Sequence, residues 1–393
     1  MTDTQTTFTQ LTVPQGSFDL LRYPFRTDEK LRAWDAADEY LLEFLGAKLD
    51  AISSSKILIM NDGFGTLSVA LNAFTPVNFS DSLVSQISAR KNLAANGIDD
   101  KQVTFLESTA ALAGEFDFVL IKVPKTLALL EDQLSRIQAN ITEKTQIIAA
   151  GMVKNLPKKV WKILEKYLGP TTTSLAKKKA RMIFATVDKQ QKVPPCPYPV
   201  LYQLENTEYQ ICNHANVFSR DSLDIGTRFL LENLPETSAA KDIVDLGCGN
   251  GVVGLLLSER FPEAKIHFVD ESFMAIDSAK ETFKLYLGQK EAGKLLFEGQ
   301  HQATYHVSDA LDDFDKDSAD LIVCNPPFHQ QHATADKVAM NMFYQSRKVL
   351  KTSGELWVIG NRHLNYKHQL KKLFGNVTVV AANTKFVICK ASI

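Results

Sequence analysis

The chain has 393 residues, 45% hydrophobic and 23% charged, the composition of an ordinary globular protein long enough for two domains. Its formal net charge is −1, so any nucleic-acid surface must be a local patch rather than a property of the whole chain. The five scattered cysteines exclude a Cys-x-x-Cys zinc cluster, and the lack of a signal pattern or a membrane-spanning apolar run predicts a cytoplasmic protein with no membrane partner.

Strands and helices alternate in the first half of the chain. "KILIMNDGFGTLSVAL" (56–71) contains an apolar strand, a glycine-containing turn and an apolar helix start. "VNFSDSLVSQISARKNL" (77–93) and "FDFVLIKVPK" (116–125) follow in the same strand-first order. This alternation predicts a βαβ domain with a largely parallel sheet.

Positive charge is concentrated in residues 154–181, where Glu165 is the lone acid. A segment of this kind can bind phosphates, and a solvated helix face is the alternative. The residues expected to bind RNA are Lys158, Lys159, Lys162, Lys177, Lys178, Lys179 and Arg181.

A polar and then proline-rich segment, "DKQQKVPPCPYP" (188–199), separates the two halves and has the composition of a linker. We therefore predict a first domain over 1–190, a linker over 191–199 and a second domain over 200–393. In the second domain, "HANVFSRDSLDIGTRFLLENL" (214–234) predicts a helix that floors a cofactor pocket. The residues assigned to that pocket are Phe218, Gly226 and Thr227.

The next segment, "VDLGCGNGVVG" (244–254), is a strand that ends in a glycine-rich turn. Gly247 and Gly249 let the backbone turn tightly and let a ligand approach it, with Asn250 beside them. A dinucleotide fingerprint needs a different glycine spacing, because Gly249 and Gly254 lie too far apart.

Two acids accompany this turn. Asp245 precedes it and would repel a phosphate but suit a cationic amino-acid group. Asp270 ends the next strand, where a carboxylate can accept both hydroxyls of a ribose, although a solvated acid at a strand end is the alternative. Together they favour S-adenosylmethionine over NAD as the cofactor.

Two more strand ends follow. "YHVSDALDDF" (305–314) ends at Ser308 and Asp309, and Asp309 is either an acceptor for the adenine amino group or the N-cap of the next turn. "ADLIVCNPPF" (319–328) must end as a strand at its prolines, which lack the ladder donor. That places Asn325 and Phe328 at the carboxyl edge of the sheet, where open α/β sheets bind ligands. A proline-terminated turn with a buried phenylalanine is the alternative.

The two halves look like copies of one plan. Three segments of the first half match three of the second in order, and Phe79 and Asp81 align with Phe268 and Asp270 at one offset. The expected fold is therefore α/β, with two related βαβ domains.

The quoted strings also resemble a known family. "VDLGCGNG", "VDES" and "NPPF" resemble the class I S-adenosylmethionine-dependent methyltransferases that modify exocyclic amino groups. "HANVFSRDSLDIGTRFL", "NPPFHQQHA", "AADEYLL", "LIKVPKTLALLE" and "LGPTTTSLAKKKAR" are similar to the two-domain ribosomal RNA guanine-N2 methyltransferases, and this resemblance covers nearly the whole chain.

This resemblance implies two tandem Rossmann-like class I methyltransferase domains, S-adenosylmethionine as cofactor, and a guanine in 23S ribosomal RNA or a large-subunit precursor as substrate. The Asn325 side-chain carbonyl and the Pro326 backbone carbonyl would accept the hydrogens of the target amine. Pro327 would stiffen the turn, and Phe328 would stack on the base. No metal is expected, because the "HQQH" pair that follows has no third ligand at suitable spacing.

The first domain is predicted to be degenerate and to bind RNA. It has Lys122 where the second domain has Asn325, and a lysine offers no acceptor to an amino group. Two other functions remain open: a 16S rRNA guanine-N2 methyltransferase, and a non-catalytic RNA-binding ribosome-assembly factor. The basic segment 360–372 is either an RNA contact or a solvated helix face, and we expect the protein to be a monomer.

Overall fold

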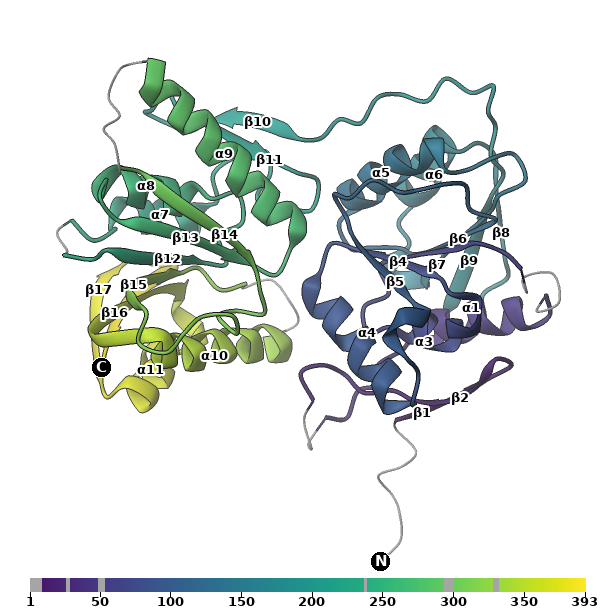
Figure 1. Ribbon diagram of the computed structural model, residues 1–393, viewed down its shortest axis with the longest axis horizontal. Helices are drawn as coiled ribbons and strands as arrows, with labels where there is room; N and C mark the ends of the chain where they lie inside the picture. Colours follow the sequence, from purple (N-terminus) through teal and green to yellow (C-terminus); the bar gives the residue numbers. More distant parts are fainter. Residues whose placement is uncertain (1–8, 26–28, 49–53, 237–238, 293–299, 328–331) are drawn as a thin grey trace, which may run out of the picture. The chain divides into compact units, whose positions relative to one another are not determined.

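The chain folds into two compact units, Met1–Pro197 and Tyr198–Ile393 (Figure 1). The computed structural model describes residues 9–25, 29–48, 54–236, 239–292, 300–327 and 332–393. None of the helices within these ranges has the length and apolar character needed to cross a membrane.

The first unit contains a seven-stranded sheet in the order β5-β4-β3-β6-β7-β9-β8, preceded by a two-stranded hairpin. The pairings are parallel from β5 to β7, and β9 runs antiparallel to both of its neighbours. The strands are β1 (Gln10–Val13), β2 (Gly16–Asp19), β3 (Ile57–Met60), β4 (Val77–Ser80), β5 (Thr104–Glu107), β6 (Phe118–Lys122), β7 (Gln146–Met152), β8 (Thr171–Thr173) and β9 (Ala180–Ala185).

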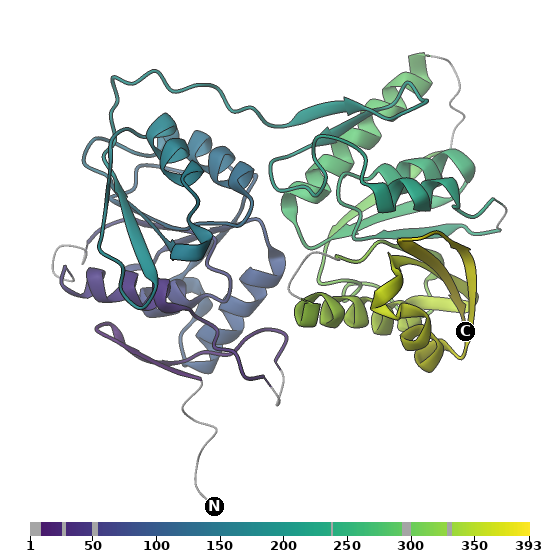
Figure 2. The same cartoon turned by 180° about the vertical axis from the view of Figure 1, so that it is seen from behind.

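Helices cover both faces of this sheet, with α1, α3 and α4 on one face and α5 and α6 on the other (Figures 1 and 2). The central strand β3 is therefore buried on both sides. Ile57 and Ile59 pack toward α1, whereas Leu58 and Met60 pack toward α5. The helices are α1 (Ala36–Gly46), α3 (Thr66–Ala70), α4 (Leu83–Ala95), α5 (Leu127–Arg136) and α6 (Lys159–Tyr167).

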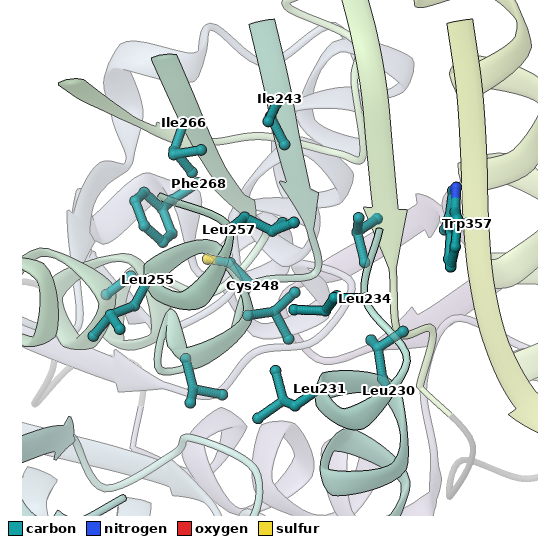
Figure 3. Packing of buried hydrophobic residues seen from close by; sticks show 14 of the residues in the cluster. Leu230, Leu231, Leu234, Ile243, Cys248, Leu255, Leu257, Ile266, Phe268 and Trp357 are labelled. Carbon is teal, nitrogen blue, oxygen red and sulfur yellow. The ribbon is translucent and has the colours of Figure 1, made fainter. Parts of the chain in front are cut away.

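The second unit repeats this topology, with the sheet order β14-β13-β12-β15-β16-β18-β17 and β18 as the antiparallel strand. Helices α7, α8 and α9 pack on one face through the core in Figure 3, and α10 and α11 pack on the other. The strands are β10 (Val200–Gln203), β11 (Gln210–Asn213), β12 (Asp242–Leu246), β13 (Lys265–Asp270), β14 (Gln302–Val307), β15 (Ala319–Cys324), β16 (Leu350–Asn361), β17 (Asn376–Ala382) and β18 (Phe386–Ser392). The helices are α7 (Ile225–Glu232), α8 (Val252–Arg260), α9 (Phe273–Ala292), α10 (His332–Val349) and α11 (Tyr366–Phe374).

One glycine starts the first crossover helix in each unit. Gly65 and Gly251 both have a φ of +79°, in the left-handed region. A Cβ would lie 2.4 Å from the Ala89 backbone at Gly65 and 2.9 Å from the Ala279 backbone at Gly251. Each glycine thus permits both the turn and the close packing of the neighbouring helix. The prediction of two tandem, largely parallel α/β units is confirmed.

The strand pairing corrects one detail of the predicted repeat. The last residue of β3 pairs with Phe79, and the last residue of β12 pairs with Val269. These two residues therefore correspond, and so do Ser80 and Asp270. The sequence alignment, which matched Asp81 with Asp270, is wrong by one residue because it followed identical residue types rather than ladder positions.

Candidate active site

A short chain of hydrogen bonds joins the end of β15 to the start of α7. The Asn325 amide nitrogen donates to the Thr227 hydroxyl over 3.0 Å, and this hydroxyl donates to the Asp224 carboxylate over 3.4 Å. Asp224 is the N-cap of α7 and also accepts from the Thr227 backbone N–H over 2.9 Å. Because a carboxylate only accepts, the hydroxyl donates to it and offers its lone pairs to Asn325. This order fixes which end of the Asn325 amide faces the helix.

The other end of that amide is an acceptor that nothing in the described part of the chain satisfies. The Asn325 Oδ1 is buried and has no hydrogen-bond partner among those residues. Leaving such a group unpaired costs about 1–3 kcal/mol, so it marks a position where a ligand can supply the missing donor. Pro326 and Pro327 follow directly and end the strand at this point. Phe328, the fourth residue predicted to be catalytic, lies outside the described residues.

The glycine turn after β12 lies beside this strand end. Gly247 and Gly249 have φ values of +74° and +53°. The Gly247 N–H donates to the Val269 carbonyl over 2.8 Å, which ties the turn to the neighbouring strand. A Cβ at Gly249 would meet nothing within 4 Å, so the space above this part of the turn is open. The turn therefore leaves room for a ligand against its backbone.

Asp270 ends β13 and holds the same turn. Its Oδ2 accepts from the Gly249 N–H over 3.0 Å, and its Oδ1 accepts from the Ser272 N–H over 3.0 Å. A carboxylate offers about four lone-pair sites, and these two bonds use one on each oxygen. The geometry is compatible with the predicted ribose contact and adds a tie to the loop that the sequence did not indicate.

Asp245 lies beneath the turn and is only 3% exposed. Its Oδ2 accepts from the Gly254 N–H over 2.8 Å, in the first turn of α8. The pKa of Asp245 is raised to about 7, mainly by burial and to a smaller extent by the nearby Asp270 charge, against the lowering effect of the Gly254 hydrogen bond. Its carboxyl therefore supports the helix start, and a contact with a cationic ligand stays a prediction.

The Asn250 side chain is occupied inside the unit. Its amide nitrogen donates to Asn213 Oδ1 over 2.9 Å and lies 3.4 Å from the Tyr202 hydroxyl, while its oxygen accepts from the Val252 N–H. These bonds fix the loop to the β10–β11 hairpin. The predicted contact of Asn250 with a cofactor stays a prediction. Neither Asn213 nor Tyr202 could be identified from sequence, since a polar residue at a strand end has many roles.

Ser308 and Asp309 follow β14 at the same sheet edge. The Ser308 N–H donates to the Asp270 carbonyl over 3.0 Å, and the Ser308 hydroxyl is buried with no partner in the described part of the chain. The Asp309 carboxylate accepts from Asn341 on α10 over 3.4 Å. The contact of these residues with adenine stays a prediction.

Phe218 and Gly226 have different surroundings. Phe218 is 56% exposed in the segment before α7. A Cβ at Gly226 would lie 3.1 Å from a ring carbon of Phe386, so this glycine permits α7 to pack on β18. The structure thus brings together Gly247, Gly249, Asp270, Ser308 and Asn325 at neighbouring strand ends. It does not show a pocket role for Gly226.

In the first unit, Lys122 occupies the position that corresponds to Asn325. Lys122 follows the last residue of β6 that pairs with β3, just as Asn325 follows the last residue of β15 that pairs with β12. Lys122 bonds the N-terminus of α1 through Asp38 over 2.7 Å and Asp35 over 2.9 Å. Burial disfavours its charge, yet the two carboxylates raise the pKa of Lys122 above its ordinary value. An internal ion pair therefore replaces the unpartnered acceptor of the second unit.

The rest of this strand edge is also filled. The Asn61 amide, at the position of Gly247, exchanges two hydrogen bonds with the buried Gln133 side chain, at 2.9 and 2.8 Å. Ser80 stands where the second unit has Asp270, and its hydroxyl accepts from the Ser82 N–H over 3.1 Å. No carboxylate is present for a ribose at that position.

The basic segment 154–181 does not form one patch. Lys158, Lys159 and Lys162 are exposed at the start of α6 and have no ion-pair partner in the ranges that the structure describes. Lys177 and Lys178 instead form ion pairs with Glu43 and Glu39 of α1, on the opposite face of the sheet (Figure 1). The unbroken run of charge in the sequence is therefore divided by the sheet.

Two further predicted RNA contacts belong to the hairpin that leads into β9. Lys179 is exposed, with a φ of +63°. Arg181 is half-buried, and its Nε is buried without a hydrogen-bond partner in the described chain. No group of three metal-ligating residues occurs within the described ranges.

Comparison with known proteins gives the family. Residues 8–189 match the family model "RLMG N-terminal domain", and residues 208–390 match "Methyltransferase small domain". Proteins named ribosomal RNA large subunit methyltransferase G from Ectopseudomonas mendocina and Stutzerimonas stutzeri are each 45% identical to the chain, covering 97% of it and 99% and 98% of their own lengths. The protein of that name from Pseudomonas aeruginosa is also 45% identical, over 96% of the chain and 98% of its own length.

Among solved structures, the chain is similar to a T. thermophilus 16S rRNA N2 methyltransferase determined with AdoMet and guanosine. The TM-score is 0.70 at 19% identity, over 98% of this chain and 97% of the other. At that identity the likeness concerns the fold, and it shows that both units have the Rossmann-like fold of that protein. Because these relatives are 45% identical to it over nearly its whole length, the chain belongs to the ribosomal RNA large subunit methyltransferase G family.

Proposed function

We propose that this protein transfers a methyl group from S-adenosylmethionine to the exocyclic N2 amine of a guanine in 23S ribosomal RNA. Membership of the family supports methyl transfer as the class of reaction, and the family's members are named for the large ribosomal subunit. The single observation that supports the chemistry at this site is the buried Oδ1 of Asn325 at the carboxyl end of β15, which has no hydrogen-bond partner among the described residues.

The target amine is a poor nucleophile because its lone pair is delocalised into the purine ring. Bound S-adenosylmethionine would supply the reactive methyl group on a positively charged sulfonium. The chain has to orient the amine and hold its lone pair toward that methyl group. Asn325 does so by accepting an amine hydrogen at Oδ1, while the backbone carbonyl of Pro326 accepts the second.

Thr227 and Asp224 act through Asn325. Their hydrogen bonds hold the amide nitrogen toward α7, which leaves the amide oxygen toward the substrate. An asparagine free to rotate would also present its amide nitrogen, and a donor cannot accept an amine hydrogen. The relay therefore selects the productive orientation of the amide.

The adjoining strand ends would hold S-adenosylmethionine. Asp270 would accept the ribose hydroxyls, the backbone of Gly247 and Gly249 would border the ligand, and Ser308 and Asp309 would lie at the adenine end. This arrangement agrees with the open space above Gly249 and with the unpartnered Ser308 hydroxyl.

The first unit binds RNA and carries out no methyl transfer. Lys122, Asn61 and Ser80 replace the acceptor, the glycine turn and the ribose acid of the second unit. The exposed lysines of α6 supply positive charge. The protein acts in the cytoplasm, where ribosomal RNA and large-subunit precursors are made.

The test is methyl transfer from radiolabelled S-adenosylmethionine to unmodified 23S and 16S rRNA, followed by mapping of the methylated nucleotide. Label in N2-methylguanine of 23S rRNA is expected. Label only in 16S rRNA would assign the protein to the small-subunit reaction. Cofactor binding without transfer to either RNA would contradict the proposed reaction.

A further inference from the structure

We propose that the carboxyl edge of the second sheet carries a binding site for the RNA phosphodiester backbone, formed by Arg362 and Lys385 beside Asn325. That the bound RNA is 23S rRNA rests on the proposed function. The site would hold the strand that flanks the target guanine.

The first observation is the charge of the C-terminal segment. Residues 356–393 contain no aspartate or glutamate, in a protein whose net charge is −1. Lys390 pairs with Glu355 over 2.8 Å. The other basic side chains here have no ion-pair partner in the described part of the chain, and they are Arg362, Lys367, Lys371, Lys372 and Lys385.

The second observation is where two of these charges lie. Cys324 pairs with Val358 in the parallel ladder of β15 and β16, so Asn325 lies level with the next residue of β16. Arg362 follows three residues later, about 10 Å farther along the strand direction. Lys385 lies next to it, because the Arg362 N–H donates to the Lys385 carbonyl over 3.0 Å. Both charges thus extend from the edge at which Asn325 lies.

The third observation is the shape of this surface. Asn361, Arg362, His363, Thr384 and Lys385 line a hollow of about 360 Å³, and no carboxylate is among them. The Arg362 guanidinium donates to the Asn383 carbonyl over 3.1 Å, which holds its position. A guanidinium has five N–H donors, so donors remain for a phosphate after this bond.

The chemistry favours a phosphodiester over an acidic peptide. Arginine and lysine beside a shallow hollow match spaced single negative charges, and a methyltransferase that acts on a base must hold the backbone on either side of it. Lys367, exposed in the first turn of α11, adds one more positive charge shortly after Arg362 in the chain. The proposed path therefore leads from Asn325 across the hollow toward the first turn of α11.

The experiment neutralises the two charges together, as Arg362→Gln with Lys385→Gln in the full-length protein. The matched control is Arg347→Gln with Lys348→Gln. These two residues are exposed at the end of α10, next to the first residue of β16 and therefore at the opposite edge of the sheet. Affinity for a 23S rRNA transcript is measured across a salt series, alongside affinity for S-adenosylmethionine and methyl transfer.

The test variant should bind the RNA on the order of 10-fold more weakly, with the slope of log affinity against log salt reduced by about 1.4–1.8, for two lost phosphate contacts. Cofactor affinity, and kcat at saturating RNA, should match wild type. Equal RNA affinity and equal slopes in the test variant, the control and wild type would overturn the site, whether or not methyl transfer is found. A wild-type protein that binds RNA through these charges but transfers no methyl group would contradict the proposed function alone.

Discussion

The Asn325 amide nitrogen lies 3.0 Å from the Thr227 hydroxyl, across 98 residues of sequence. The corresponding link in the first unit is the ion pair between Lys122 and Asp38, at 2.7 Å. In each unit the bond joins the end of the corresponding strand, β15 or β6, to the first turn of the helix that precedes the sheet, α7 or α1. In one unit it orients an acceptor, and in the other it satisfies a buried charge.

Thr227→Val should lower kcat by on the order of 10-fold while leaving S-adenosylmethionine affinity near wild type. The valine keeps the shape but removes the hydroxyl that orients Asn325, which costs about one hydrogen bond in the transition state. Thr227→Ser retains the hydroxyl and should restore kcat. Loss of cofactor affinity with unchanged kcat would instead place Thr227 in the cofactor pocket.

Asp270→Ala should weaken S-adenosylmethionine binding by on the order of 10²-fold, because hydrogen bonds to a carboxylate contribute about 1.5–3 kcal/mol each. Isothermal calorimetry measures the affinity, and thermal unfolding monitors the fold. Asp320→Ala is the matched control, because Asp320 also accepts two backbone N–H groups. It lies near the start of β15 and therefore at the opposite edge of the sheet from Asp270. An Asp270 variant with wild-type affinity would remove this residue from the ribose role.

Asp245→Asn should make the second unit more resistant to rising pH. The pKa of Asp245 is raised to about 7, so its folded form holds a proton that the unfolded chain releases near pH 4. Its contribution to stability is therefore fully present below pH 4 and is lost as the pH rises toward 7, at up to about 1.4 kcal/mol per pH unit. The difference in unfolding free energy between variant and wild type should move in favour of the variant from pH 5 to 7.5. A constant difference would show that this carboxyl does not titrate there.

Neutralising Lys158, Lys159 and Lys162 together to glutamine should weaken 23S rRNA binding and reduce its salt dependence, because these exposed charges on α6 have no ion-pair partner in the described chain. The matched variant is Lys177→Gln with Lys178→Gln, whose charges are already paired with acids of α1. Per charge removed, it should have a smaller effect on the salt slope. The opposite ranking in filter-binding titrations would move the RNA surface to the α1 face.

Much of the fold follows from local pattern. The apolar strands, the glycine turns and the proline stop predict both sheets and place Asn325 at a strand end. The role of the Thr227 hydroxyl and the partners of Lys122 were not predictable, since those contacts join segments far apart in sequence. The basic run 154–181 looked like one patch because sequence does not record which face of a sheet each residue occupies.

The alignment of the two halves was wrong for a related reason, because sequence does not record the ladder position of each residue either. Asp81 and Asp270 share a residue type, yet the strand pairing shows that Ser80 is the residue of the first unit that corresponds to Asp270. The Asn250 side chain also bonds Asn213, a contact that the sequence did not indicate. Residue types at a glycine turn indicate a binding loop, and only the packing decides which of them face the ligand.

The central claim is that the Asn325 amide oxygen accepts a hydrogen of the target amine. Single-turnover methyl transfer to 23S rRNA by Asn325→Ala, with S-adenosylmethionine affinity measured on the same preparation, tests it most directly. The rate should fall by on the order of 10²-fold or more while cofactor affinity stays near wild type, because the lost contact is made to the substrate. A variant that transfers the methyl group at the wild-type rate would contradict the claim.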